Sequence, residues 1–310
     1  MIKNFLKNRN FILILAMMVG LLWGGGAKWT EGTTLPALAL IMTLSTMGIS
    51  GNAFRSFRDF LGPALAGIGM NYLILGSFLL GLNTLLIQDE ALRAGFVIIA
   101  AVPPAVAVIP FTFFLKGDGP FSLIAMIGAY LGALIIMPLI TLVFLGLGLI
   151  DPSKLILIMI ELILAPLVLS RLLTRIRMNS RLESIKGAIT NWSFFLITYT
   201  IVGLNRELIL RQPLSLLPVA FIAVASTFFL GWGIEKISNI FRIPQKTVIS
   251  LLLLGTLKNY GLAGGLALTL FSKQTSVPAT VSTVFMTVYI IWLEFKGRRQ
   301  ESNPKKPTFP

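Results

Sequence analysis

The feature that most constrains this chain is a succession of apolar stretches, each bounded by charged or turn residues. Most of them exceed the ~17 residues that an α-helix needs to cross the hydrocarbon core of a membrane. They fall near 10–27, 34–50, 62–87, 95–115, 120–148, 153–176, 187–205, 213–237, 245–271 and 277–295. The sequence therefore predicts an all-α integral membrane protein with about ten transmembrane helices. The first stretch follows basic residues as in a signal peptide, but further apolar stretches follow, so we interpret it as the first span.

Composition also indicates that lipid surrounds most of this chain. Apolar residues make up 55% of the chain and charged residues 12%, against about 25% charged in soluble domains, so the lipid bilayer is the expected partner. The net charge of +14 does not predict nucleic-acid binding, because the basic residues lie at the ends of apolar stretches. The chain has no Cys and no His, which excludes thiol nucleophiles, His-based catalysis and ordinary zinc sites. We expect no enzyme activity, no cofactor and no metal.

The basic residues also predict topology. Most of the 26 Lys and Arg lie in connections on the side of the N-terminus, which predicts a multi-pass protein of the cell (inner) membrane with both termini in the cytoplasm. The chain divides into two halves, 1–150 and 151–300, and a polar tail, 301–310, that we expect to be disordered. Each half holds an odd number of spans, so related halves would be inverted repeats.

The fourth and ninth spans are interrupted. The fourth carries Pro103, Pro104 and Pro110, which remove backbone donors, and the ninth carries clustered glycines and polar residues over 255–265. Matching interrupted spans in two halves are the best pointer to a transporter binding site, since helix ends at membrane depth can hold an ion or substrate. The alternative is a pair of kinked packing helices.

Two ionisable residues lie deep within spans. Lys258 is about thirteen residues from each end of its span, too far to reach the interface easily. It is either a fixed or titratable charge in the substrate cavity, or a structural cation bonded to carbonyls of the broken fourth span. Glu161 is either protonated and bonded to a neighbouring helix, or it lines the cavity or pairs with Lys258.

Further polar residues at membrane depth are candidate ligands, with helix–helix hydrogen bonding as the alternative. They are Asn71, Thr112, Asn191, Thr256 and Asn259. Asn259 is the stronger candidate, because it adjoins Lys258. The arginines of 171–181 are interpreted as a topology anchor.

Several of these segments resemble the bile acid:sodium symporter (BASS) family. The resemblance lies in Asp59-Phe60, Asn71-Tyr72, Pro103, Lys116-Gly117-Asp118 and Lys258-Asn259-Tyr260-Gly261-Leu262-Ala263. It implies ten helices in two inverted five-helix repeats, with the discontinuous fourth and ninth helices crossing. It also implies a panel domain of spans 1, 2, 6 and 7, a core domain of spans 3–5 and 8–10, and alternating access to a site between them. Family substrates are mostly organic anions.

The chain departs from the resemblance at the sodium sites. Sodium-coupled members carry Glu and Gln where this chain has Leu254 and Lys258, and Ser and Asn where it has Val108 and Ile109. Thr112 and Asn259 match. We therefore hypothesise that the Lys258 ammonium replaces bound sodium. A buried lysine can also lose its proton, so proton coupling or uniport becomes an option and sodium coupling is doubtful.

The leading interpretation is a secondary carrier of a small organic anion. The alternatives are a carrier of an auxin-efflux-like or arsenite-efflux-like branch, an intramembrane enzyme or a channel. The absence of Cys argues against the arsenite carrier. The enzyme interpretation is weakened because the sequence shows no paired acid and base. The channel interpretation is weakened because the sequence shows no repeated filter motif.

Overall fold

Helices form every regular element in the part of the chain that the structure describes. The structure is a computed structural model, and it describes residues 9–47, 57–105, 107–146, 153, 157, 160–161, 165–176, 178–211 and 213–302. The α-helices are α2 (Arg9–Leu22), α3 (Ala27–Thr30), α4 (Thr34–Thr46), α5 (Phe57–Ile68), α6 (Ser77–Leu86), α7 (Glu90–Ala101), α8 (Val108–Phe114), α9 (Gly119–Leu145), α11 (Ala165–Arg175), α12 (Met178–Leu204), α13 (Arg206–Arg211), α14 (Leu217–Val224), α15 (Leu230–Ile240), α16 (Gln245–Leu254), α17 (Tyr260–Leu270) and α18 (Val277–Ser302). The all-helical prediction is confirmed for these residues.

Two wide-turn segments continue the α-helices without a break. The π-helix η4 (Gly69–Gly76) joins α5 to α6, and the π-helix η7 (Ala225–Phe229) joins α14 to α15. Short 3-10 helices cover the remaining turns: η1 (Gly24–Gly26), η2 (Glu31–Thr33), η6 (Pro213–Leu216) and η8 (Gln274–Ser276). The π segments lie in the third and the eighth predicted spans, which are the third span of each half. Such segments frequently mark functional sites in helices.

Five continuous helices in the described residues are long and apolar enough to cross a membrane, or six if one bent pair is counted. The five are Phe60–Leu86, Gly119–Leu145, Ile185–Leu204, Leu217–Ile240 and Gln274–Gly297, and the pair, Phe11–Leu22 with Gly24–Leu44, bends by 91°. The number is smaller than about ten because the fourth and ninth predicted spans are each cut into short helices. Of the sixth predicted span, 153–176, the described helix α11 covers only Ala165–Arg175, and several residues before it lie outside the described part of the chain.

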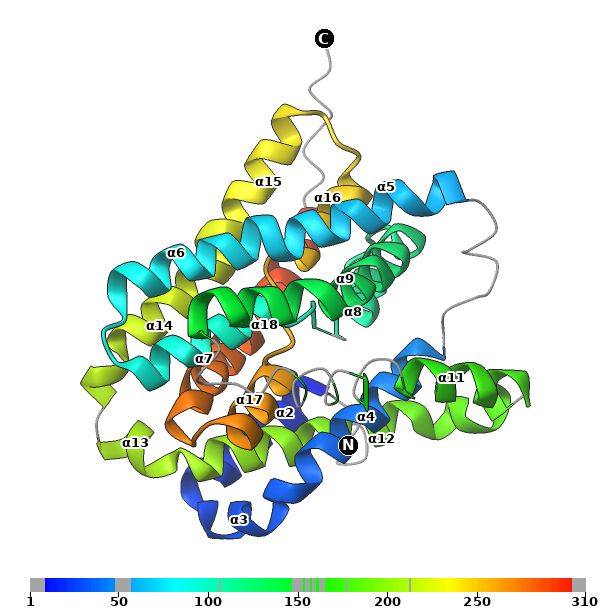
Figure 1. Cartoon of the computed structure of the whole chain (residues 1–310). Helices are drawn as coiled ribbons and strands as arrows, with labels where there is room; N and C mark the ends of the chain where they lie inside the picture. The colour runs from blue at the N-terminus through cyan, green and yellow to red at the C-terminus, as the bar shows by residue number, and fades with distance from the viewer. Residues whose placement is uncertain are drawn as a thin grey trace.

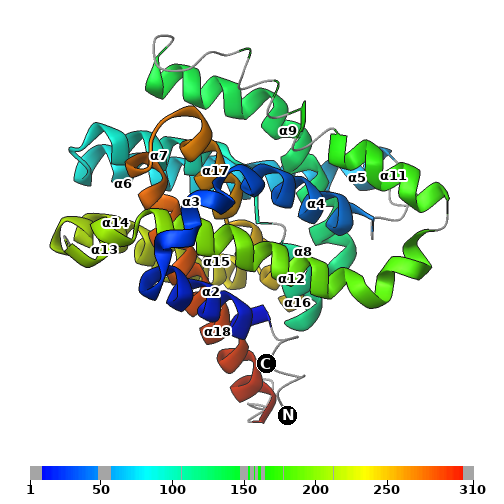
Figure 2. The same ribbon diagram turned by 90° about the horizontal axis from the view of Figure 1, so that it is seen from below.

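The helices gather in two groups (Figure 1). In one group, α12 runs along α2 and α4, and α11 contacts α4 and α12. In the other, α5 packs on α9, α14 packs on α18, and α7 contacts α9, α17 and α18. In the view from below, α12 and α4 lie side by side in front of helices of the second group (Figure 2), and α12 contacts α17 and α18. The contact between the groups therefore involves α17, the second half of the broken ninth span.

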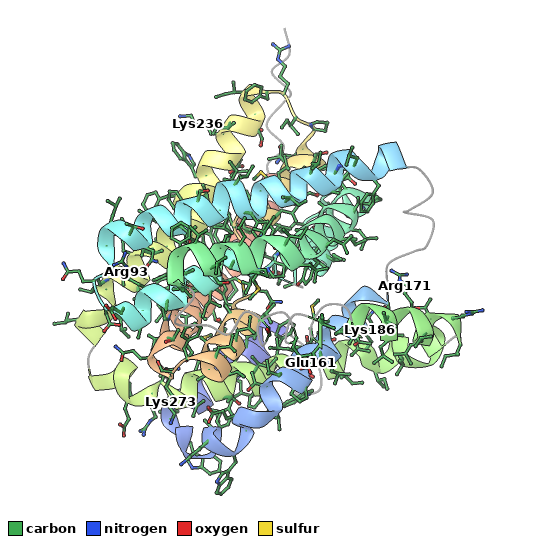
Figure 3. All side chains as sticks on the ribbon, in the orientation of Figure 1. Arg93, Glu161, Arg171, Lys186, Lys236 and Lys273 are labelled. Carbon is green, nitrogen blue, oxygen red and sulfur yellow. The ribbon has the colours of Figure 1, made fainter. Side chains whose placement is uncertain are left out.

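Charged side chains mark two opposite ends of the molecule. Figure 3 shows Arg93 and Lys273 at one end, and Arg171 and Lys186 at the other. At the first end, the Asp89 carboxylate accepts a hydrogen bond from Gln274 Nε2 at 2.9 Å, which joins the start of α7 to η8. Of the predicted tail, 303–310 lies outside the described residues, while α18 continues to Ser302.

Close approach of α5 and α9 depends on glycine. A Cβ atom on Gly67 would lie 2.0 Å from the carbonyl oxygen of Ala125, and a Cβ on Gly128 would lie 2.6 Å from Cα of Ala64. Because these neighbours are backbone atoms, they can yield only if the two helices separate. Small residues at helix interfaces are the usual means of close packing in membranes.

We expect Gly67→Ala to lower the melting temperature of the detergent-solubilised protein, because the added methyl group forces α5 away from α9. Overpacking of this kind lowers the free energy of unfolding by about 1–3 kcal/mol. The matched control is Gly62→Ala in the same helix, where a Cβ meets nothing within 4 Å. That change should be neutral or stabilising by about 0.5–1 kcal/mol, since alanine favours helix more than glycine. Equal melting temperatures for the two variants would contradict the packing argument.

Candidate functional site

The first half of the site is the break that ends α7. The helix starts at the N-cap Asp89, whose carboxylate accepts a hydrogen bond from the Leu92 amide, and it ends at Ala101 with Val102 extended. Proline at 103 and 104 removes the amide donors that would otherwise bond to the carbonyls four residues earlier. The carbonyl of Ala100 thus loses its helical partner because residue 104 is proline. The predicted break in the fourth span is present.

The second half of the site is the break between α16 and α17. The chain leaves helix at Gly255, and a Cβ there would lie 2.6 Å from Ile234 Cδ1 and from Met70 Cε. Helix resumes at Tyr260, where the Asn259 side-chain oxygen caps α17 by accepting a hydrogen bond from the Leu262 amide at 3.0 Å. Asparagine is among the preferred N-cap residues. The predicted break in the ninth span is present, and Asn259 has a defined role in it.

The two breaks contact each other directly. Pro104 and Lys258 form an isolated antiparallel β-bridge. The amide of Ala105 donates to the carbonyl of Leu257 at 3.0 Å, and the amide of Asn259 donates to the carbonyl of Pro103 at 3.1 Å. This reciprocal pair satisfies backbone groups of both unwound segments where the surrounding lipid offers no hydrogen bonds. We call residues 102–105 and 255–259 the crossing.

Lys258 occupies the centre of the crossing. Its side chain is 0% exposed, and its Nζ donates hydrogen bonds to the carbonyls of Ala100 at 2.7 Å and Val102 at 2.9 Å. Nζ also lies 4.7 Å from the centroid of the Tyr72 ring. Two carbonyls at the C-terminal end of α7 provide the negative end of a helix dipole. The ammonium therefore supplies the donor that Pro104 cannot give to Ala100.

Side chains from neighbouring helices hold both sides of the crossing. Asn71 Nδ2 donates to the carbonyl of Val102 at 3.2 Å. The hydroxyl of Tyr130, in α9, donates to the carbonyl of Pro104 at 2.8 Å and lies 3.4 Å from Asn259 Nδ2. Tyr130 thus bridges the two broken spans. Sequence reasoning missed it, since a tyrosine inside a long apolar helix carries no motif.

The two candidate threonines, Thr112 after the first break and Thr256 within the crossing, make hydrogen bonds of the helix-packing kind. Thr112 Oγ1 bonds to the carbonyl of Val108 and to Ser122 Oγ at 2.8 and 2.9 Å, and Thr256 Oγ1 bonds to the carbonyl of Leu252 at 2.7 Å. Both threonines are buried, and their bonds are those of the helix-packing alternative. The side chain of Pro110 lies outside the described residues, although its backbone belongs to α8.

Glu161 and Lys258 are both described, and they do not form an ion pair. Glu161 is exposed, whereas Lys258 is fully buried against carbonyls. The interpretation that Glu161 pairs with Lys258 is therefore not supported. The other two interpretations, that Glu161 bonds to a neighbouring helix or lines the substrate cavity, stay predictions.

A narrow crevice lies beside the crossing, between the two groups of helices. Its free volume is about 40 Å³, and the residues around it come from α2, α8, α12, α17 and α18 together with the segment before α8. Ala107, immediately before α8, and Gly261, at the start of α17, both line it. The other lining side chains are apolar or are threonines, such as Phe111, Ile197 and Thr280. Helix N-termini carry partial positive charge, so an apolar crevice here meets the positive end of α17.

Comparison with known proteins identifies the family of this chain. A model of the Sodium Bile acid symporter family matches residues 35–212, which is more than half of the chain. The chain is also 25% identical over 243 residues to a protein of rice (Oryza sativa subsp. japonica) described as "Probable sodium/metabolite cotransporter BASS2, chloroplastic". The alignment covers 76% of this chain and 57% of that relative's length. On the extent of the family match, this chain belongs to the Sodium Bile acid symporter family.

Proposed function

We propose that this protein is a secondary transporter that carries a small organic anion across the cell membrane by alternating access. Membership of the Sodium Bile acid symporter family supports a transporter, and the similar rice protein is described as a sodium/metabolite cotransporter. The family favours this interpretation over the auxin-efflux-like, arsenite-efflux-like, enzyme and channel alternatives.

The proposal includes ten transmembrane helices in two inverted repeats, 1–150 and 151–300. Three observations support it. The fourth and ninth spans are both broken, the third and eighth spans both contain a π segment, and the two breaks pair through a reciprocal antiparallel bridge. A reciprocal pair of this kind has a local two-fold axis, as inverted repeats require. The repeats place α2, α4, α11 and α12 in the panel and the remaining long helices in the core.

The narrowness of the crevice supports alternating access in this proposal. Its free volume of about 40 Å³ is too small for an organic anion, since ligand sites commonly enclose about 300–1,000 Å³. The crevice lies where α12 contacts α17 and α18. Movement of the panel helices away from α17 would open it beside Gly261 and the positive end of α17. We therefore place the substrate there, with its charge toward α17.

The ammonium of Lys258 takes the place of sodium in this proposal. Its two bonds to carbonyls at the end of α7 are the observation that carries this part, because carbonyls at helix C-termini are the groups that coordinate sodium in broken-helix transporters. A sodium ion 4 Å from the ammonium would be repelled by about 4 kcal/mol at an effective dielectric constant of 20. The side chains of Leu254 and Val108 also contain no oxygen that could bind a sodium ion.

Transport in proteoliposomes tests the proposal. Substrates are first found by a thermal-shift screen of the purified chain against organic anions, since a ligand that binds the folded state raises its melting temperature. We expect saturable uptake of the selected anion that is unchanged when an inward sodium gradient is replaced by a potassium gradient. A proton gradient, imposed in parallel, distinguishes proton coupling from uniport. Stimulation by sodium would overturn the sodium-independent mechanism, and uptake that does not saturate would overturn the carrier.

A further inference from the structure

A second pocket lies away from the crossing and is rich in lysine. Its free volume is about 300 Å³, several times that of the crevice. The charged residues that line it are Lys116, Glu235, Lys246 and Lys296. Glu235 forms an ion pair with Lys296, so the charged groups around the pocket sum to an excess of two positive charges.

Two of the three lysines, Lys116 and Lys246, lie on elements that are joined by hydrogen bonds. Lys116 follows α8 and has a φ of 61°, a left-handed conformation in which non-glycine residues are uncommon. Two residues later the Asp118 amide donates to the carbonyl of Lys246 at 3.0 Å and to Ser250 Oγ at 3.1 Å. The segment that carries Lys116 is therefore joined to the start of α16, which carries Lys246. Lysine thus occupies a conformation that glycine or asparagine would adopt with less strain.

Aromatic residues place this pocket near the level of the lipid headgroups. Lys296 Nζ lies 5.2 Å from the centroid of the Trp292 ring, and Lys236 Nζ lies 4.8 Å from that of Trp232. Both tryptophans are exposed, at 42% and 61%, and each is one helical turn from a lysine. Tryptophan with neighbouring lysine is typical of a membrane interface. Since Glu235 and Lys296 line the pocket, its opening lies beside this interfacial layer.

From this arrangement we propose that the lysine pocket binds the phosphate group of an anionic ligand, most directly an anionic phospholipid headgroup. Lysine binds phosphate as a point charge, and juxtamembrane cations attract anionic lipids. The occupied pocket would link the end of α8, the start of α16 and the end of α18. These helices include one half of each broken span, so a bound phosphate would stabilise the group of helices around the crossing.

Melting temperature in detergent, in a phosphate-free buffer, tests this inference without reference to transport. The probes are a short-chain phosphatidylglycerol, a short-chain phosphatidylcholine of equal chain length, inorganic phosphate and malonate. We expect the first to raise the melting temperature by several degrees and the second to have no effect. In a Lys116→Asn, Lys246→Gln double variant the apparent Kd for phosphatidylglycerol should rise about tenfold or more, because two charge-assisted contacts are lost. Asparagine tolerates the left-handed conformation of residue 116.

The matched control is Lys236→Gln, which removes a positive charge from α15 but not from the pocket lining. It should keep the wild-type response to phosphatidylglycerol. Stabilisation by inorganic phosphate that the double variant loses also supports the site and identifies a soluble source of the phosphate. An unchanged response in the double variant, an equal response to malonate, or no response to either phosphate probe would overturn the inference.

Discussion

Replacing Lys258 with Met is expected to abolish uptake and to lower the stability of the protein more than any other single lysine substitution. Hydrogen bonds to charged groups each contribute about 1.5–3 kcal/mol, and Lys258 makes two, to the carbonyls of Ala100 and Val102. Methionine has similar length but no donor, so the Ala100 carbonyl stays buried and unsatisfied. We expect the free energy of unfolding to fall by about 3 kcal/mol or more. A lower melting temperature would show the loss of stability, and an uptake assay would show the loss of transport.

The control for this variant is Lys236→Met. Lys236 also stacks its ammonium on an aromatic ring, that of Trp232 at 4.8 Å, but it is exposed. Removing the Lys236 ammonium should lower the free energy of unfolding by at most about 1 kcal/mol, which is the usual contribution of an exposed cation–π contact. If both variants lost the same stability, the carbonyl contacts of Lys258 would not be the source of its effect.

Replacing Lys258 with a smaller side chain tests whether its ammonium occupies the position of a bound cation. Lys258→Ala leaves space beside the carbonyls of Ala100 and Val102, and the Val102 carbonyl also accepts a hydrogen bond from Asn71 Nδ2. We expect sodium or methylammonium to raise the melting temperature of this variant and not that of the wild type. No response of the variant to either cation would contradict the proposal that the ammonium occupies a cation position.

A disulfide between the two groups of helices should stop transport completely. The chain has no cysteine, so an introduced pair forms the sole possible bond. A Cβ on Gly265 in α17 would lie 3.5 Å from Thr34 Cγ2 at the start of α4, so a cysteine Sγ near that methyl position would lie close to a cysteine at 265. If α4 moves relative to α17 during alternating access, oxidised Thr34→Cys, Gly265→Cys protein should show no uptake, and a reductant should restore it.

The matched control joins two helices of the same group. A Cβ on Gly264 in α17 would lie 3.5 Å from Cβ of Ala279 in α18. Oxidised Gly264→Cys, Ala279→Cys protein should keep its uptake rate, because α17 and α18 are proposed to move together. Full uptake by the oxidised 34–265 pair, with the disulfide verified by mass spectrometry, would exclude relative motion of α4 and α17 as a step of transport.

The sequence predicted the local features of the site well because they depend on single residue types. Pro103 and Pro104 lack amide donors wherever they occur in a helix, so the end of α7 could be placed without a structure. Lys258 in the middle of an apolar span required a partner, and a carbonyl of the fourth span was one of the two partners considered. Asn259 was expected to matter, although its role as the N-cap of α17 was not specified.

Features that depend on contacts between distant segments could not be predicted. Tyr130 bridges the crossing only because α9 packs beside it, and the hydrophobic pattern of α9 gives no sign of this. The separation of Glu161 from Lys258 depends on how the helices are arranged, which length and composition do not determine. The same holds for the lysine pocket, whose members come from positions 116 to 296.

The bond between Lys258 and Ala100 spans 158 residues of chain, and this has a consequence for biosynthesis. A ribosome adding about 5–20 residues per second needs about 10–30 s to proceed from one partner to the other. During that interval the nascent first half has an unwound stretch whose carbonyls have no donor from the second half. We expect the N-terminal helices to remain near the insertion machinery, or near water, until residue 258 has been made. A chain truncated before that point should be a preferred substrate for membrane quality-control proteases.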